Sequence, residues 1–256
     1  MTERVTFKNS KGQKIVGALD RPDKENPPVI IVCNSWARDK NLNPMGGTGK
    51  FFSENGFAVL RFDFAGVGES EGDEKELSIQ TEADDLQSAI NYIICQSINK
   101  KQIYLIGHSM GGTAVAIASN SIKIKINALV MWSPVGDYKL VYEKYYLKNK
   151  KDLDKKGYFI RHSYSRNKDV FTGKNLMENF RTINLDEIFS KIMNPTLLIY
   201  PKDDELSLDM KRIEKLTKLI TVEKKLLEIP GNHNFDGKQV VNNLYKETLK
   251  WFKKYL

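Results

Sequence analysis

The sequence has little of several features that define particular classes of protein. It contains only two cysteines in 256 residues, so a disulfide framework is excluded, and we expect Cys33 and Cys95 to be reduced and buried. Its longest apolar runs, such as Val29 to Cys33 and Ala128 to Trp132, are far shorter than the ~20 residues that cross a bilayer. The first residues also lack the basic, apolar and small-residue order of a signal peptide. We therefore expect a cytoplasmic protein with no membrane span.

The overall composition is that of a globular domain. Hydrophobic residues make up 41% of the chain, and the charged residues, 28% of the total, include both signs. This balance does not fit a disordered, collagen-like or coiled-coil chain. At 256 residues, the chain is long enough for one α/β domain with a sizeable core.

The net charge of +8 is concentrated in one segment. Between Tyr138 and Lys168 there are ten basic and three acidic residues, which gives +7, and the remainder of the chain is close to neutral. This distribution argues against a general nucleic-acid surface, so we predict no nucleic-acid partner. The basic segment has two interpretations: a solvated face that keeps it soluble, or a surface that attracts an anionic part of a substrate.

Short apolar, strand-like segments alternate with helical patterns along most of the chain. The helical pattern from Glu82 to Ile94 has its apolar residues on one face, and a second, from Gln239 to Tyr255, should pack on the sheet. Near the N-terminus, Arg4 to Leu19 is typical of a hairpin. The alternation predicts an α/β fold with a mostly parallel sheet and right-handed crossovers. The predicted buried strands are Val29–Cys33, Ala58–Asp63, Ile103–Ile106, Ala128–Trp132, Thr196–Tyr200 and Lys225–Ile229.

One long segment interrupts this alternation. From Tyr138 to Ser190 the usual short connection is replaced by an insertion rich in Lys and Tyr. We interpret residues 138–190 as a cap, and residues 1–137 and 191–256 as the α/β core. No internal repeat is visible.

The residues Gly107-His108-Ser109-Met110-Gly111 match the G-x-S-x-G turn that exposes a nucleophilic serine between a strand and a helix. The preceding apolar run supplies the strand, and the small residues from Thr113 to Ala118 supply a closely packed helix. Side chains at the two glycines would collide with the tight backbone, and the helix N-terminus stabilises negative charge near the serine. Ser109 is therefore the predicted nucleophile.

A serine hydroxyl needs a base, which is normally a histidine. The chain has three histidines: His108 belongs to the nucleophile turn itself, and His162 lies in the predicted cap. By elimination, the base is His233, which follows the last predicted strand in a loop at the C-terminal edge of the sheet.

The third member of a triad is an acid that orients the histidine. The order Ser, acid, His is expected for this turn type, and both Asp203 and Asp204 follow the strand that ends at Tyr200. Either aspartate could be the orienting acid, and the other could cap a following helix.

With these motifs, the sequence resembles the α/β-hydrolase family over nearly its whole length, in particular small bacterial carboxylesterases with a short cap, including cinnamoyl or feruloyl esterases. Arg61 to Ser70 is similar to the family motif R-x-D-x-x-G-x-G-x-S, and Gly231-Asn232-His233 to its G-x-H loop. The family motif I-H-G-x-x-D-x-V, laid on Ile199 to Leu206, selects Asp204 as the acid. The resemblance implies a structural turn role for Asp63.

The loop after the first buried strand departs from the family. Relatives have His-Gly and an apolar residue, whereas this chain has Asn34-Ser35 followed by Trp36. Backbone N–H groups carry no side-chain identity, so the resemblance still implies an oxyanion hole formed by the N–H groups of Trp36 and Met110. The same loop is also similar to that of bacterial acyl-thioesterases.

These features predict a serine hydrolase that cleaves a small carboxylic ester through an acyl-enzyme, with no metal and no cofactor. The alternatives are an acyl-thioesterase or acyltransferase with the same triad, and a non-catalytic ligand-binding protein of the same fold. The sequence leaves the oligomeric state open, a homodimer included. We expect the cap to lie over Ser109 and to supply aromatic walls. These aromatic residues are Tyr138, Tyr142, Tyr145, Tyr146, Tyr158, Phe159 and Tyr164.

Overall fold

The computed structural model describes residues 1–96, 98–163, 166–204 and 210–256. Its centre is an eight-stranded sheet with the order β1-β2-β4-β3-β5-β6-β9-β10. The six strands from β4 to β10 in this order are parallel, and the antiparallel hairpin β1–β2 joins the edge through β4. The prediction of a mostly parallel α/β sheet with an opening hairpin is confirmed. The strands are β1 (Thr2–Lys8), β2 (Lys14–Asp20), β3 (Val29–Cys33), β4 (Ala58–Phe62), β5 (Ile103–His108), β6 (Ala128–Trp132), β9 (Thr196–Pro201) and β10 (Lys224–Ile229).

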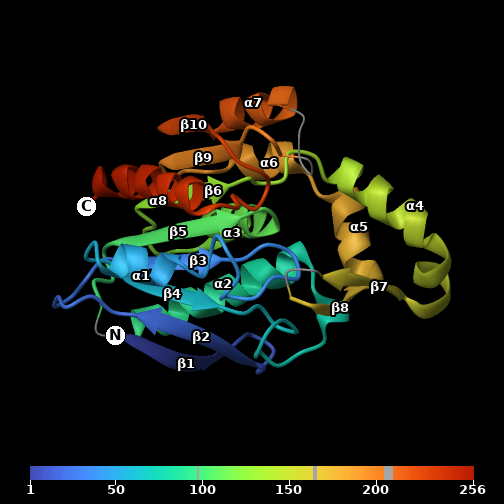
Figure 1. Cartoon of the computed structure of the whole chain (residues 1–256), viewed down its shortest axis with the longest axis horizontal. Coiled ribbons are helices and arrows are strands. Elements are labelled where there is room, and N and C mark those ends of the chain that lie inside the picture. The colour runs from blue at the N-terminus through green and yellow to red at the C-terminus, as the bar shows by residue number, and fades with distance from the viewer. Residues whose placement is uncertain (97, 164–165, 205–209) are drawn as a thin grey trace.

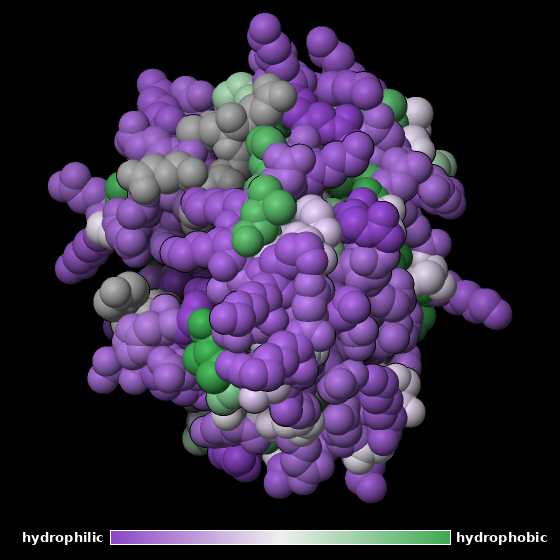
Figure 2. Space-filling model, turned by 90° about the vertical axis from the view of Figure 1, so that its right-hand side faces the viewer, coloured by the Kyte–Doolittle hydropathy of each residue, from purple (hydrophilic) through white to green (hydrophobic). Residues whose placement is uncertain are grey.

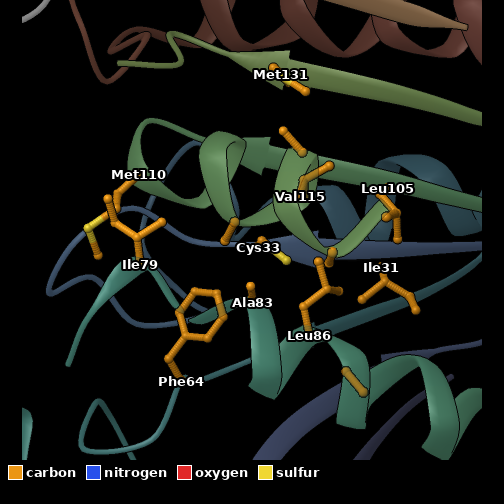
Figure 3. Close-up of a cluster of buried hydrophobic side chains, with 14 of the residues drawn as sticks. Ile31, Cys33, Phe64, Ile79, Ala83, Leu86, Leu105, Met110, Val115 and Met131 are labelled. Carbon is orange, nitrogen blue, oxygen red and sulfur yellow. The ribbon is translucent and has the colours of Figure 1, made fainter. Parts of the chain in front are cut away.

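Helices cover both faces of this sheet because the buried strands are apolar on both sides. In β3, Ile30 and Val32 face one core cluster with helices α1 and α8, while Ile31 and Cys33 face the other with α2, α3 and α7. Figure 3 shows part of this second cluster, in which Cys33 lies between the sheet and side chains of α2 and α3. The helices of the two layers are α1 (Thr48–Ser53), α2 (Ile79–Ile94), α3 (Met110–Ser121), α7 (Met210–Leu219) and α8 (Lys238–Lys253).

The C-terminal helix is anchored to the sheet by polar contacts as well as by its apolar stripe. The indole Nε1 of Trp132 donates a hydrogen bond to Thr248 Oγ1 over 3.0 Å. The Tyr104 hydroxyl donates to the carbonyl of Tyr255 over 2.6 Å. The prediction that this last helix packs on the sheet is therefore confirmed.

Between β6 and β9, the chain from Tyr138 to Thr182 extends beyond the C-terminal end of the sheet, whereas Leu185–Ser190 returns to the sheet and packs beside α3 and α7. Helix α4 begins after Asp137, whose side chain accepts a hydrogen bond from Lys139 N, and it ends at Gly157 in the left-handed conformation (φ 80°). In Figure 1 α4, the hairpin and α5 lie at the right, at the opposite end from the two termini. The same end faces the viewer in Figure 2 and is mostly hydrophilic. The elements of this segment are α4 (Tyr138–Lys156), β7 (Tyr158–Ser163), β8 (Lys168–Gly173), α5 (Lys174–Thr182) and α6 (Leu185–Ser190).

The β7–β8 hairpin is fastened to the core by one carboxylate. Glu74, in the short 3-10 helix η1 (Glu74–Glu76), forms an ion pair of 2.5 Å with Arg166 and accepts a hydrogen bond from the backbone N–H of Phe171. Arg166 also donates to the carbonyl of Ala37, in the loop after β3. These contacts hold the hairpin against the loop that precedes α1.

The two cysteines differ in environment. Cys33 is buried, as expected, but Cys95 is exposed, and the prediction of burial for Cys95 is wrong. Cys95 is the C-cap of α2, two residues beyond Ile93, the last buried residue of the helix. Among the helices that the structure describes, none is long and apolar enough to cross a membrane.

Candidate active site

Ser109 occupies the tight turn between β5 and α3. Its backbone has φ 54° and ψ −119°, and its N–H donates to the carbonyl of Trp132 over 2.8 Å. The flanking glycines permit the turn: a Cβ on Gly107 would lie 2.3 Å from the Gly111 carbonyl oxygen, and one on Gly111 2.2 Å from that of Asn34. A side chain at either position would therefore push the turn apart.

Ser109, His233 and Asp204 lie in one line of hydrogen-bonding contacts. His233 Nε2 is 3.0 Å from Ser109 Oγ, and His233 Nδ1 is 2.8 Å from Asp204 Oδ2. Ser109 and His233 are each 7% exposed and Asp204 is 0% exposed, so the three side chains are almost completely shielded from bulk water. With the Nδ1 proton directed to the carboxylate, Nε2 is the acceptor that faces the serine hydroxyl.

The two neighbouring aspartates have different surroundings. Asp204 is buried against His233, whereas the side chain of Asp203 is exposed. The backbone N–H of Asp203 donates to the carbonyl of Gly231 over 2.9 Å, which ties this loop to the one that carries His233. Glu205 and Leu206, which complete the motif used to choose between the aspartates, lie outside the described residues.

His108 has a position that the sequence analysis did not predict. Its ring is fully buried, and its Nε2 lies 2.9 Å from the carbonyl oxygen of His233. Burial, with the nearby His233, holds the pKa of His108 well below its ordinary value, so the ring is neutral and donates its Nε2 proton to that carbonyl. No local pattern indicates this contact, because the two histidines are 125 residues apart.

The loop after β3 meets α4 and α5 next to Ser109. The Trp36 indole packs edge-on against Tyr145 of α4, at 5.1 Å between ring centroids, and against Phe180 of α5, at 5.6 Å. Trp36 and Met110, the two predicted oxyanion donors, both line the cavity that contains Ser109. The Met110 side chain lies beside Ile79 in the core (Figure 3). Met110 is the first residue of α3, where backbone N–H groups lack partners within the helix.

A cavity of about 440 Å³ lies over Ser109 and His233. Helices α4 and α5 contribute Tyr138, Val141, Tyr145 and Phe180 to its wall. Of the other aromatic residues expected there, Tyr142 stacks on Tyr146, Tyr158 contacts Phe171, and Phe159 is buried behind Tyr145. These four are absent from the described lining, and Tyr164 lies outside the described residues.

Three basic side chains line the same cavity: Arg38, Lys144 and Arg161. Burial lowers the pKa of both arginines, which nonetheless stay charged because the guanidinium is so strong a base. In the described part of the chain, no group of three or more His, Cys, Asp and Glu side chains is arranged to hold a metal ion.

Known proteins of similar sequence and structure were compared with the whole chain. The uncharacterized protein YfhR of Escherichia coli O157:H7 is 28% identical over 240 residues, which cover 92% of this chain and 74% of YfhR. The structure of DcsB in complex with a substrate analogue superposes with a TM-score of 0.84 at 18% identity, over 100% of both chains. Est1E from Butyrivibrio proteoclasticus with bound ferulic acid gives a TM-score of 0.78 at 19% identity, over 98% of both chains. At these identities, the structural similarity shows a shared fold.

The family assignment follows from the sequence itself. The model of the alpha/beta hydrolase fold matches residues 28–175, which include the strand before Trp36, the turn at Ser109 and the elements from α4 to β8. The sheet order and the layers of helices agree with that match. The chain belongs to the α/β-hydrolase fold family.

Proposed function

We propose that this protein is a serine hydrolase that cleaves carboxylic esters through an acyl-enzyme. Ser109 is the nucleophile, His233 is the general base and acid, and Asp204 orients His233. The observation that carries the proposal is the 3.0 Å separation of His233 Nε2 from Ser109 Oγ, with Asp204 on the other ring nitrogen. Nucleophile, base and orienting group in contact are the arrangement that activates a serine hydroxyl.

In the first half of the reaction, Ser109 Oγ attacks the ester carbonyl while His233 Nε2 takes the hydroxyl proton. The tetrahedral intermediate collapses, and the same proton passes to the departing alcohol. In the second half, a water molecule attacks the acyl carbonyl while His233 takes one of its protons. The second tetrahedral intermediate then collapses, the proton passes to Ser109 Oγ, and the carboxylic acid leaves. Asp204 stabilises the imidazolium that forms in each half.

The oxyanion of each intermediate needs donors close to Ser109. We assign them to the backbone N–H groups of Trp36 and Met110, because both residues line the cavity at the nucleophile and Met110 begins a helix. Residues 138–190 are proposed as the cap, since several of them form the cavity wall above Ser109. The structure of Est1E, which has a similar fold and holds ferulic acid, supports the proposal that the substrate is an ester of a carboxylic acid.

The proposal is tested by the turnover of a panel of short esters and matched acyl-thioesters by the purified protein and by Ser109→Ala. We expect ester hydrolysis by the wild type and a loss of about 10⁴-fold or more in kcat in the variant. Turnover of thioesters in strong preference to esters would move the assignment to the acyl-thioesterases. Equal turnover by wild type and variant would exclude a serine mechanism altogether, and no turnover of any substrate would favour a binding protein.

A further inference from the structure

The cavity over Ser109 has charge of one sign only. Arg38, Lys144 and Arg161 line it, and among the lining residues that the structure describes there is no aspartate or glutamate. Pockets for small ligands are usually apolar with a few placed polar groups that fix orientation. The cavity at the proposed nucleophile therefore has three positive charges and no carboxylate. A neutral ester would leave these charges uncompensated.

Arg161 is the cavity residue whose positive charge has little compensation. It is in β7, half-buried, and its guanidinium carbon lies 4.5 Å from the centre of the Trp36 ring. Its Nε is buried and has no hydrogen-bond partner within the described residues, and no carboxylate there is within ion-pair distance of it. The acid that acts on it from a distance, Glu74, is bound by Arg166 and by the N–H of Phe171.

Arg38 differs from Arg161 in having compensating partners close by. Its charge is partly offset by Asp39 and Asp236, and one of its terminal nitrogens donates to the carbonyl of Asn43. Lys144 is on the exposed side of α4 and can approach the cavity mouth with a flexible chain. Of the two arginines, Arg161 therefore has the less compensated charge within the described residues.

We propose that the ester substrate carries a second, anionic group, a carboxylate or a phosphate, which the Arg161 guanidinium binds over the Trp36 ring. This deepens the proposed hydrolase function and rests on it. The planar guanidinium presents parallel N–H donors that match two oxygens of either anion, and its cation–π contact with the Trp36 ring positions it beforehand. The cavity volume of about 440 Å³ suits a small molecule with one such group.

The geometry also explains why the contact would affect catalysis. Trp36 is the residue whose N–H we assign to the oxyanion hole, and its ring contacts Arg161 on one side and Tyr145 and Phe180 on others. An anion bound to Arg161 would thus be held next to the loop that receives the ester carbonyl. Arg161 acts here as a specificity-determining residue.

The test compares pairs of esters that differ in charge and not in shape. The 4-nitrophenyl monoester of glutaric acid is compared with 4-nitrophenyl 5-methylhexanoate, which places the anion in the acyl part. In the second pair, 4-acetoxybenzoate is compared with 4-isopropylphenyl acetate, which places the anion in the alcohol part. A further substrate, 4-acetoxyphenyl phosphate, distinguishes phosphate from carboxylate. The measured quantity is the ratio of kcat/KM for the anionic ester to that for its neutral partner, each normalised to its rate with hydroxide.

We expect at least one ratio to fall by 10-fold or more in Arg161→Gln and to be partly kept in Arg161→Lys. Any displacement of Trp36 in the variant affects both esters of a pair and cancels in the ratio. The control is Lys148→Gln, an exposed basic residue of the same cap helix that is absent from the cavity lining, which should leave the ratio unchanged within 2-fold.

Hydrolysis of the neutral esters with ratios that Arg161→Gln leaves unchanged would overturn this inference and leave the proposed function standing. An equal fall in Lys148→Gln would also overturn it, because the effect would then belong to the whole basic segment. If the wild type hydrolyses none of the esters, the proposed function fails, and the inference that rests on it fails with it.

Discussion

The Nε2 atom of His108 lies 2.9 Å from the carbonyl oxygen of His233, so the residue before the proposed nucleophile holds the loop that carries the proposed base. The two rings are 5.3 Å apart between centroids. A neutral His108 is the donor in this contact, and burial keeps it neutral. The strand end and the histidine loop are thus positioned relative to each other by one buried hydrogen bond.

Replacement of His108 by Phe should lower kcat with little change in KM. The variant keeps a ring of similar size and loses the donor, and a hydrogen bond of about 1 kcal/mol corresponds to a fall of roughly 5-fold. His108→Asn, which retains a donor group, should recover part of the loss. Steady-state kinetics on one ester checks this, and an unchanged kcat in His108→Phe would show that the loop is held by other contacts.

The two adjacent aspartates should behave differently. Asp204→Asn removes the carboxylate that faces His233 Nδ1, so we expect a fall in kcat of about 10³-fold or more. Asp203→Asn changes an exposed side chain in the same loop and should stay within 2-fold of the wild type. A large loss in Asp203→Asn with an active Asp204→Asn would reverse the assignment.

Glu82 makes stability depend on pH. This residue of α2 is fully buried, and neither carboxylate oxygen has a hydrogen-bond partner within the described residues. Burial, with the nearby Asp85, raises the pKa of Glu82 well above its ordinary value. The folded state therefore keeps a proton that the unfolded chain releases above its own pKa of about 4.3, and stability falls as pH rises beyond that value, by at most about 1.4 kcal/mol per pH unit.

Glu82→Gln cannot ionise and should lack this contribution. Urea unfolding between pH 4.5 and 7.5 should show the free energy of unfolding of the variant rising relative to that of the wild type as pH increases. The exposed Glu54, changed to Gln, is the matched control and should leave the pH dependence as in the wild type. Parallel curves for wild type and Glu82→Gln would mean that Glu82 is ionised in the fold.

The buried ion pair of Lys40 and Asp63 should be important for stability, because each side chain compensates the charge of the other. Lys40 Nζ lies 2.7 Å from Asp63 Oδ2, and the side chains are 6% and 0% exposed. The same carboxylate accepts the backbone N–H groups of Lys40 and Glu69, which is a turn role of the kind that the family resemblance implied.

Asp63→Ala leaves the buried Lys40 ammonium with only the solvent-exposed carboxylate of Glu69, 3.5 Å away, and should cost about 3–5 kcal/mol in the free energy of unfolding. In the double variant with Lys40→Met, the loss should be smaller than the sum of the two single losses, because no uncompensated charge remains. Chemical denaturation of the four proteins measures this coupling. Strictly additive losses would indicate that the pair contributes nothing beyond its separate contacts.

The elements of the fold that depend on local sequence patterns can be predicted from the sequence. The β-branched run Val29–Cys33 matches β3, and Ala128–Trp132 matches β6, because strands buried on both faces need uninterrupted apolar residues. The nucleophile turn was recognisable because its backbone requires glycines at two fixed positions.

Features formed between distant segments could not be predicted in this way. The β7–β8 hairpin has mostly exposed or half-buried residues, so its pattern lacks an apolar face. The contact of Arg161 with Trp36, like that of His108 with His233, joins residues more than 120 positions apart and depends on how the cap and loops pack. The exposure of Cys95 is not predictable from the apolar stripe of α2, because Cys95 directly follows the end of the helix.

Covalent labelling shows whether Ser109 is the nucleophile and whether His233 activates it. The wild type is treated with a fluorophosphonate, which phosphonylates activated serine hydroxyls, and the protein is examined by intact mass spectrometry and peptide mapping. We predict one adduct, on the peptide that contains Ser109, no adduct in Ser109→Ala, and labelling at least 100-fold slower in His233→Ala. Labelling of Ser109→Ala at the wild-type rate, or no adduct on Ser109 in the folded wild type, would show that Ser109 is not the activated nucleophile.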